Sequence, residues 1–210
     1  MSVKQLAEKI INARSGRCSE DCKYCAQSAH YKTKCETYDF LDKDKIVSEA
    51  ISNESEGVDR FSLVTAGRSL CGEEFDKAIE VYKELSGKSK LCLCASMGLL
   101  KPEQFRRLKE AGVSRYHANI ETTEKYFSNI CTTHTFEDKI NVIKAAKAEG
   151  LSVCSGGIIG MGESFRDRIS GNGTKVFLSG ANATITGNML TTTGSTIKSD
   201  LEMFKRMNRK

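Results

Sequence analysis

Three cysteines near the start of the chain are spaced as ligands of an iron–sulfur cluster. Cys18, Cys22 and Cys25 form a C-x3-C-x2-C pattern. A structural zinc ion takes four closed ligands, and an electron-transfer cluster takes four cysteines. Three thiolates leave one iron of a 4Fe–4S cluster open, and an open iron can bind and reduce a small molecule. The alternative, a zinc knuckle or a set of loose thiols, lacks a fourth ligand at zinc-finger spacing.

Composition narrows the class of protein. The chain has 210 residues, nine cysteines and a formal charge of +5. Basic and acidic residues are interspersed, which predicts a solvated mixed-charge surface and no nucleic-acid partner. No apolar stretch is long enough for a membrane span, and no signal core is visible. Many cysteines in a chain that is not exported indicate reduced thiols, metals or clusters, and we expect a cytoplasmic protein.

Strands and helices are predicted to alternate about five times, as parallel sheets with crossover helices require. Strands are expected at 10–14, 60–65, 91–95, 114–121 and 152–160. Helices are expected at 4–9, 42–56, 73–86, 102–111, 135–149 and near 195–207, with Gly112 and Gly150 as stops.

The alternation predicts an α/β fold, a parallel (β/α) TIM-type barrel of about five or six strands with a C-terminal helix. A closed eight-stranded barrel needs about 250 residues, so this barrel is predicted to be incomplete. We divide the chain into a barrel core at residues 1–169 and a C-terminal segment at residues 170–210.

Five segments resemble the biotin synthase family of the radical S-adenosylmethionine (SAM) superfamily. They are 15–31, 115–122, 129–133, 153–160 and the tail around 177–183 and 190–192. Two departures stand beside the resemblance. The family carries a long further segment between Arg168 and about Thr174, which supplies the last barrel strands, and its leading helical region is longer.

The resemblance implies a 4Fe–4S cluster on the three cysteines and SAM on its open iron. Asn119 and Glu121 alternate along an expected strand and would contact the ribose, while Lys139 would pair with the SAM carboxylate. The remaining SAM contacts would come from the residue before the last cysteine, the end of the second strand and a glycine-rich strand: Tyr24, Thr65, Ala66, Gly67, Ile158 and Gly160. A strand's solvated end is the plainer reading of Asn119 and Glu121.

The family also uses an auxiliary 2Fe–2S cluster as its sulfur source, usually held by three cysteines and one arginine. Cys94 and Cys154 match two of those cysteines, Ser62 stands at the third, and the arginine falls in the missing segment. We therefore hypothesise a variant cluster on Cys94, Cys131 and Cys154. The plainer reading, a small buried hydrophobic side chain, is preferred for Cys35, Cys71 and Cys92.

The three histidines, His30, His117 and His134, are not spaced as a metal set. His117 shares a predicted strand with Asn119, so it either lines the substrate side or is a satisfied core histidine.

Three functions remain open at this point. The first is biotin synthesis, a sulfurtransferase reaction in which a 5′-deoxyadenosyl radical abstracts hydrogen from two carbons of dethiobiotin and sulfur is inserted. The resemblance implies flavodoxin or ferredoxin as the reductant and a homodimer as the assembly. The second is another radical SAM sulfur-inserting enzyme, similar to lipoyl synthase. The third is a shortened, inactive remnant whose open sheet edge exposes unpaired backbone.

Overall fold

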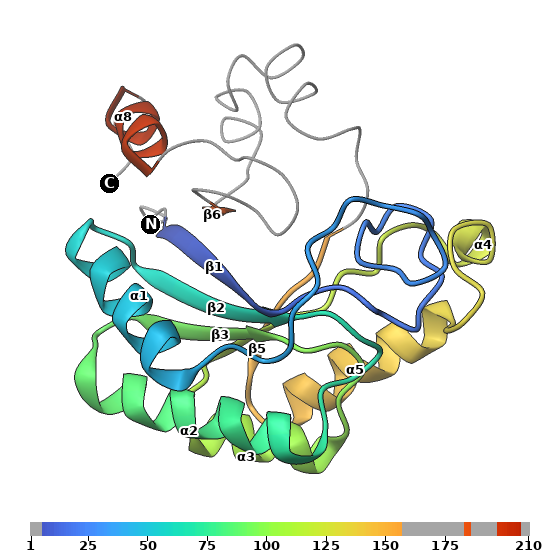
Figure 1. The fold of residues 1–210 in the computed structure, drawn as a ribbon, viewed down its shortest axis with the longest axis horizontal. Coiled ribbons are helices and arrows are strands. Elements are labelled where there is room, and N and C mark those ends of the chain that lie inside the picture. Colours follow the sequence, from blue (N-terminus) through green and yellow to red (C-terminus); the bar gives the residue numbers. More distant parts are fainter. Residues whose placement is uncertain (1–5, 157–182, 186–196, 207–210) are drawn as a thin grey trace.

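The computed structural model describes residues 6–156, 183–185 and 197–206. Its centre is one six-stranded parallel sheet with the strand order β5-β4-β3-β2-β1-β6. Figure 1 shows the sheet with its helices below and the loop after β1 at one end. The strands are β1 (Leu6–Arg14), β2 (Arg60–Thr65), β3 (Cys92–Ser96), β4 (Arg115–His117), β5 (Ser152–Cys154) and β6 (Ala183–Ile185).

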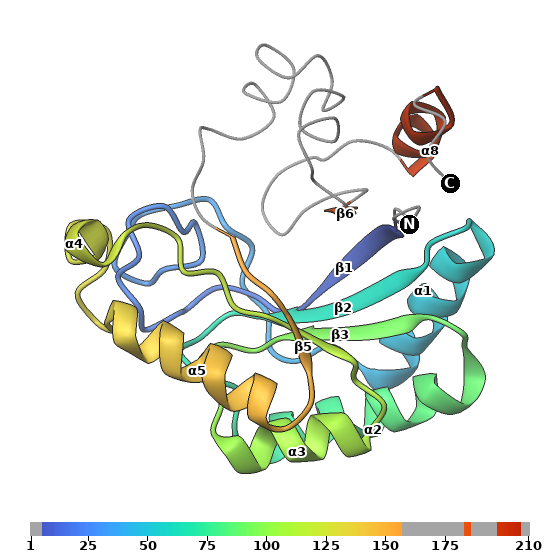
Figure 2. The same cartoon turned by 180° about the vertical axis from the view of Figure 1, so that it is seen from behind.

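Helices cover one face of this sheet, as both views show (Figures 1 and 2). The layer is formed by α1 (Lys43–Ser55), α2 (Gly72–Lys88), α3 (Pro102–Glu110) and α5 (Phe136–Ala148), while α4 (Glu124–Phe127) lies near the loop end and α8 (Ile197–Arg206) near the start of β1. Phe61, Leu63 and Tyr116 of the strands pack with Phe75 and Phe105 of the helices, all buried. Burying this apolar face is the main source of stability for the sheet.

The ends of the helices follow from local chemistry. The Asp42 carboxylate caps α1 by accepting from the backbone nitrogens of Asp44 and Lys45, at 2.9 and 3.3 Å. After α3 and α5 the chain turns at Gly112 (φ 98°) and Gly150 (φ 76°), the left-handed conformation that glycine adopts most easily. Both glycines were predicted as helix stops, and this prediction is confirmed.

Three predicted elements differ from the structure, and one of them is the strand expected at 152–160, which ends at Cys154. Residues from Leu6 onward, expected to lie in a helix, begin β1, because β1 pairs with β2 on one side and with β6 on the other. The fourth strand ends at His117 rather than at Glu121. The amides of Ile120 and Glu121 both donate to the carbonyl of Gly156, at 3.0 and 3.1 Å, which breaks the ladder, and Glu121 has φ 64°.

The sheet curves like part of a barrel but does not close within the described ranges. There, β5 and β6 each have one neighbouring strand and form the two edges. This confirms the predicted fold class, an incomplete parallel barrel.

Candidate functional site

The three motif cysteines lie in the long loop that follows β1, at the carboxyl end of the sheet. Cys18 donates its backbone N–H to Gln27 O (3.0 Å), and Ala29 returns a bond to Cys18 O (2.8 Å). At Gly16 (φ 75°) a Cβ would overlap the side chain of Thr37, so only glycine fits this turn. These contacts fold the loop back on itself and fix where the thiols stand.

The loop is fastened to the segment after α4. Lys23 N donates to Ile130 O (2.9 Å), and the Asp21 carboxylate accepts from Thr132 N (2.8 Å) and Thr133 N (3.2 Å). The Thr132 contacts keep the pKa of Asp21 below its ordinary value. Segments far apart in sequence thus hold the cysteine loop in place.

The three motif thiols are not grouped as the ligands of one ion. Cys18 and Cys22 are buried and Cys25 is half-buried. Among the described residues, the three thiols do not converge into a group whose donor atoms all lie within 4.8 Å. One zinc ion needs its ligands that close, whereas a cluster spreads them over separate irons.

A polar cradle formed by Tyr24, Asn119 and Glu121 stands beside the triad. Tyr24 and Asn119 both interact with the Glu121 carboxylate, and Lys139 in the first part of α5 acts on it through its charge. Burial raises the pKa of Glu121, while Lys139 and the two hydrogen-bonding neighbours oppose that rise. The structure therefore brings four predicted SAM contacts together, although Asn119 and Glu121 lie beyond the end of β4.

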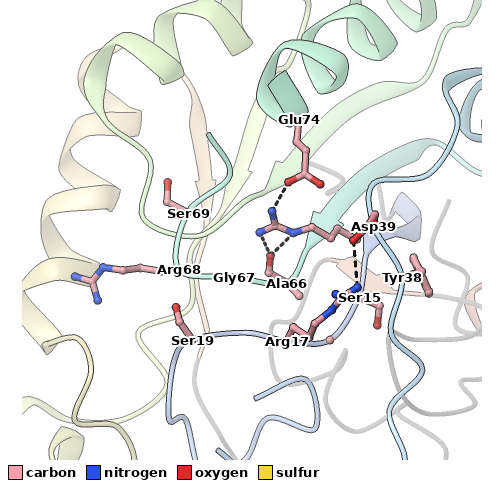
Figure 3. A pocket seen from close by; sticks show the side chains of 12 residues that line it. Ser15, Arg17, Ser19, Tyr38, Asp39, Ala66, Gly67, Arg68, Ser69 and Glu74 are labelled. Atoms are coloured by element: carbon pink, nitrogen blue, oxygen red, sulfur yellow. Dashed lines mark hydrogen bonds and ion pairs between the residues drawn. The ribbon is translucent and has the colours of Figure 1, made fainter. Parts of the chain in front are cut away.

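Two of the predicted contacts, Ala66 and Gly67, line a pocket of about 430 Å³ at the carboxyl ends of β1 and β2 (Figure 3), whereas Thr65, the last residue of β2, is not among its lining residues. Arg14 Nε donates to Ala66 O at 3.0 Å, and the same guanidinium pairs with Glu74. Gly67 has φ 112°, and a Cβ there would overlap the Arg14 guanidinium. Arg14, which the sequence did not single out, therefore fixes the backbone expected to face SAM.

The face of the sheet opposite the helices carries a second cluster of polar side chains. Ser62 and Cys94 are register partners on β2 and β3, and His117 and Cys154 are register partners on β4 and β5. His117 Nε2 lies 2.7 Å from Glu8 Oε1 on β1. This inner-face cluster, Glu8, Ser62, Cys94, His117 and Cys154, lies on the concave side of the sheet.

The electrostatics of the inner-face cluster centre on His117. Burial alone would lower its pKa, but contacts with the Cys154 and Cys94 thiols and with Glu8 outweigh burial and raise it. His117 in turn lowers the pKa of Cys154, whereas burial raises that of Cys94.

Several buried polar atoms on the same face lack a hydrogen-bond partner within the part of the chain that the structure describes. They include Asn12 Oδ1, Arg60 Nε and Ser62 Oγ. Buried polar atoms are normally satisfied, so unsatisfied ones on one concave face are what a polar ligand or cluster would require.

The sequence-based hypothesis grouped Cys131 with Cys94 and Cys154, but the structure places Cys131 elsewhere. Its sulfur lies 3.7 Å from that of Cys22 and 3.2 Å from His134 Nδ1, in a separate cluster. The loop after α4 returns to the cysteine loop, which the strand pattern alone does not reveal. Glu8, Glu20 and His134, which no spacing rule singled out, belong to these two clusters.

Other predictions have mixed outcomes. Cys71 and Cys92 are exposed and Cys35 is half-buried, so the expectation that these three are buried hydrophobic side chains is wrong. Cys71 precedes α2, and Cys92 is the first residue of β3. Ile158 and Gly160 lie outside the described residues.

No helix in the described ranges is both long and apolar enough to span a membrane.

Comparison with known families matches most of the chain. Residues 13–170 match the Radical SAM superfamily, and residues 161–210 match the Biotin and Thiamin Synthesis associated domain.

The curated relatives include several proteins named biotin synthase. One from Clostridium beijerinckii is 59% identical over 160 residues, which are 76% of this chain and 51% of that protein. Others from Brachyspira hyodysenteriae and Alkaliphilus metalliredigens are 40% and 41% identical over 261 positions, covering 94% of this chain and 78% and 82% of those proteins. The chain thus spans about half the length of the first of these relatives. Because 261 aligned positions exceed the 210 residues present, the longer relatives carry an internal stretch that this chain lacks.

Solved structures share the fold at low sequence identity. The chain is similar to methylornithine synthase, with a TM-score of 0.64, 17% identity, and coverage of 82% of this chain and 51% of that one. It is also similar to the FeFe-hydrogenase maturase HydG from Carboxydothermus hydrogenoformans, with a TM-score of 0.61, 16% identity, and coverage of 80% and 42%.

Proposed function

Because this chain belongs to the biotin synthase family of radical SAM proteins, we propose that it is a biotin synthase that inserts sulfur into dethiobiotin. The observation that carries the proposal is the placement of the Cys18, Cys22 and Cys25 loop beside the Asn119 and Glu121 cradle. Both lie at the carboxyl ends of parallel strands, where barrels of this kind place their chemistry.

The cysteine triad would hold the 4Fe–4S cluster. When bound, such a cluster would supply the one electron needed for reductive cleavage of a carbon–sulfur bond of SAM, the source of a 5′-deoxyadenosyl radical. The chain's part is to fix three thiols in a folded loop and to keep water away from two of them, which are buried.

The cradle would orient SAM beside that cluster. Glu121 and Asn119 offer an acceptor and an amide to the ribose hydroxyls, and Lys139 offers a positive charge to the carboxylate. Tyr24, which is 44% exposed, would border the bound SAM. The Thr65, Ala66 and Gly67 segment would offer backbone carbonyls to the amino group. Since Arg14 already donates two N–H groups to the Ala66 carbonyl, the carbonyls of Thr65 and Gly67 are the proposed acceptors. Ile158 and Gly160 remain proposed adenine contacts on the resemblance alone.

The inner-face cluster would hold the sulfur source and one side of the dethiobiotin pocket. Cys94 and Cys154 offer two thiolates to an auxiliary iron–sulfur cluster, 2Fe–2S or a variant of it, and His117 is within hydrogen-bonding reach of both. Unsatisfied atoms of Asn12, Arg60 and Ser62 suit a ligand that both donates and accepts, as a ureido ring does.

The remaining assignments follow from the family. We propose a flavodoxin or ferredoxin as the reductant, a homodimer as the assembly and the cytoplasm as the location, with neither nucleic acid nor membrane as a partner. We also propose the division into a core at 1–169 and a C-terminal segment at 170–210. It is supported by the separate matches at 13–170 and 161–210.

Conversion of dethiobiotin tests the proposal. The chain is purified without oxygen, reconstituted with iron and sulfide, reduced and incubated with SAM and dethiobiotin. Biotin formation that requires Cys18, Cys22 and Cys25 would support it. A cluster that cleaves SAM without making biotin would favour another sulfur-inserting reaction, similar to that of lipoyl synthase. Absence of any cluster would favour an inactive remnant, a reading that the missing internal stretch keeps open.

A further inference from the structure

Cys22, Cys131 and His134 form a compact set of metal-binding side chains distinct from the motif triad. Their ligand atoms all lie within 4.8 Å of one another. All three side chains are buried, with relative exposures of 9%, 2% and 6%. Two thiols and an imidazole are ligands that zinc and ferrous ions accept.

The spacing of the two thiols matches that around one tetrahedral ion. With metal–sulfur bonds of about 2.3 Å and metal–nitrogen bonds of about 2.0–2.1 Å, tetrahedral edges are about 3.8 Å between two sulfurs and about 3.6 Å between sulfur and nitrogen. The two sulfurs lie 3.7 Å apart, and Cys131 Sγ lies 3.2 Å from His134 Nδ1 and 3.8 Å from His134 Nε2. The two thiols are therefore already spaced for one ion, and the His134 side chain must reorient so that Nε2 faces both sulfurs.

The second ring nitrogen of His134 already has the partner that a metal-bound histidine usually has. His134 Nδ1 lies 2.5 Å from Glu20 Oε2, and Glu20 is itself buried. A carboxylate on one nitrogen directs the other toward a metal and raises its basicity. Arg68 Nη1, 3.2 Å from the same carboxylate, balances the charge of Glu20.

We propose that the cluster-free protein binds one divalent transition-metal ion, of the zinc and ferrous class, through Cys22, Cys131 and His134. Binding releases the protons of the two thiols, and their two negative charges neutralise the ion without any electron transfer. Water fills the fourth position. Since Cys22 is also a proposed ligand of the 4Fe–4S cluster, ion and cluster exclude each other, a consequence that rests on the proposed function.

Cobalt(II) titration of the full chain tests the site, because four-coordinate cobalt bound by thiolates has intense visible and charge-transfer absorption. The starting protein is the Cys18→Ala/Cys25→Ala variant, which cannot hold the cluster but keeps all three proposed ligands. It is expected to bind cobalt at this site with a tetrahedral spectrum. Adding Cys131→Ala or His134→Gln should remove one equivalent of tetrahedral cobalt, while adding Glu20→Gln should weaken binding about 10–100-fold. Adding Cys71→Ala, an exposed thiol, is the matched control and should change nothing.

Two results would overturn the site: only weak octahedral cobalt bands in the starting variant, or unchanged titrations after both Cys131→Ala and His134→Gln. Circular dichroism shows whether each variant is folded. If Cys131→Ala does not fold, the cobalt titration of His134→Gln alone tests the site. A further experiment separates this proposal from the enzymatic one. Zinc added before reconstitution should reduce iron loading of the natural sequence several-fold but not that of Cys131→Ala. If the natural sequence never binds an iron–sulfur cluster, the proposed enzymatic function is contradicted, whereas the cobalt titration still tests the metal site.

Discussion

His117 Nε2 lies 2.7 Å from Glu8 Oε1, although β4 and β1 are separated by two other strands. This contact crosses the concave face of the sheet above Ser62 and Cys94, the register partners on β2 and β3. A flat sheet could not bring these strands so close, since neighbouring strands are about 4.8 Å apart. The contact between Glu8 and His117 therefore requires the barrel-like curvature of the sheet, which also brings the other residues of the inner-face cluster close together.

The first prediction concerns this buried pair. Glu8→Gln removes one partner and leaves the His117 charge without its carboxylate, which should lower the free energy of unfolding by about 3 kcal/mol. The double variant Glu8→Gln/His117→Asn should recover part of that loss. Urea unfolding measures both, with the surface pair Arg106 and Glu149 as the control, where Arg106→Gln should change the free energy of unfolding far less than Glu8→Gln does. Equal losses for Glu8→Gln and Arg106→Gln would show that the contact is unimportant.

The second prediction concerns the SAM cradle. Glu121→Gln and Asn119→Ala each remove a polar partner proposed for the ribose and should weaken SAM binding by about 10–100-fold, the equivalent of about 1.5–3 kcal/mol. Equilibrium binding to the reconstituted protein measures this. Glu124→Gln, an exposed change in the first turn of α4, should leave affinity within twofold. Unaltered affinity in both cradle variants would move the SAM site elsewhere.

The third prediction concerns the Tyr116 hydroxyl, which accepts from Met97 N at 3.0 Å and donates to Gly98 O at 2.6 Å. Tyr116 is fully buried, so Tyr116→Phe leaves the Met97 amide unsatisfied and should cost about 1–3 kcal/mol of stability. Tyr126 is 56% exposed, and Tyr126→Phe should change stability by less than about 0.5 kcal/mol. Equal unfolding midpoints for the two variants would refute this role.

The fourth prediction is a pH dependence at the start of α5. Thr135 N donates to Asp138 Oδ2 at 2.9 Å, and the bonds with Thr135 lower the pKa of Asp138. A carboxyl with a lowered folded-state pKa stabilises the protein above its unfolded pKa, and the effect is lost as pH falls through the folded value. Asp138→Asn should therefore cost about 0.3–1 kcal/mol at pH 7, and the difference should shrink as the solution is acidified below about pH 4.

Urea unfolding at several pH values follows this difference. Lys144→Gln, in the same helix, carries no carboxyl and should show no such change over the same pH range. A cost for Asp138→Asn that stays constant down to acid pH would contradict the capping role.

Local patterns predicted the parts of the molecule that depend on neighbouring residues. Short stretches of sequence were enough to identify the cysteine motif, the parallel α/β alternation and the helix ends at Gly112 and Gly150. The strand that begins at Leu6 was mistaken for a helix because its neighbours β2 and β6 come much later in the chain.

The two side-chain clusters could not be predicted in the same way. His117 meets Glu8 only because the sheet curves, and Cys131 meets Cys22 only because the loop after α4 returns to the cysteine loop. The sequence separations of 109 residues in each case carry no periodic signal. The hypothesis that grouped Cys131 with Cys94 and Cys154 therefore lacked the tertiary contact that decides the grouping.

Formation of 5′-deoxyadenosine is the most direct measurement of the proposed chemistry. The chain is reconstituted anaerobically, reduced with dithionite and mixed with SAM, and the product is quantified beside Cys18→Ala, Cys22→Ala and Cys25→Ala. We expect deoxyadenosine from the natural sequence and none above background from the three variants. A protein that holds tightly bound zinc at the triad, or that carries a cluster but leaves SAM intact, would contradict the radical mechanism.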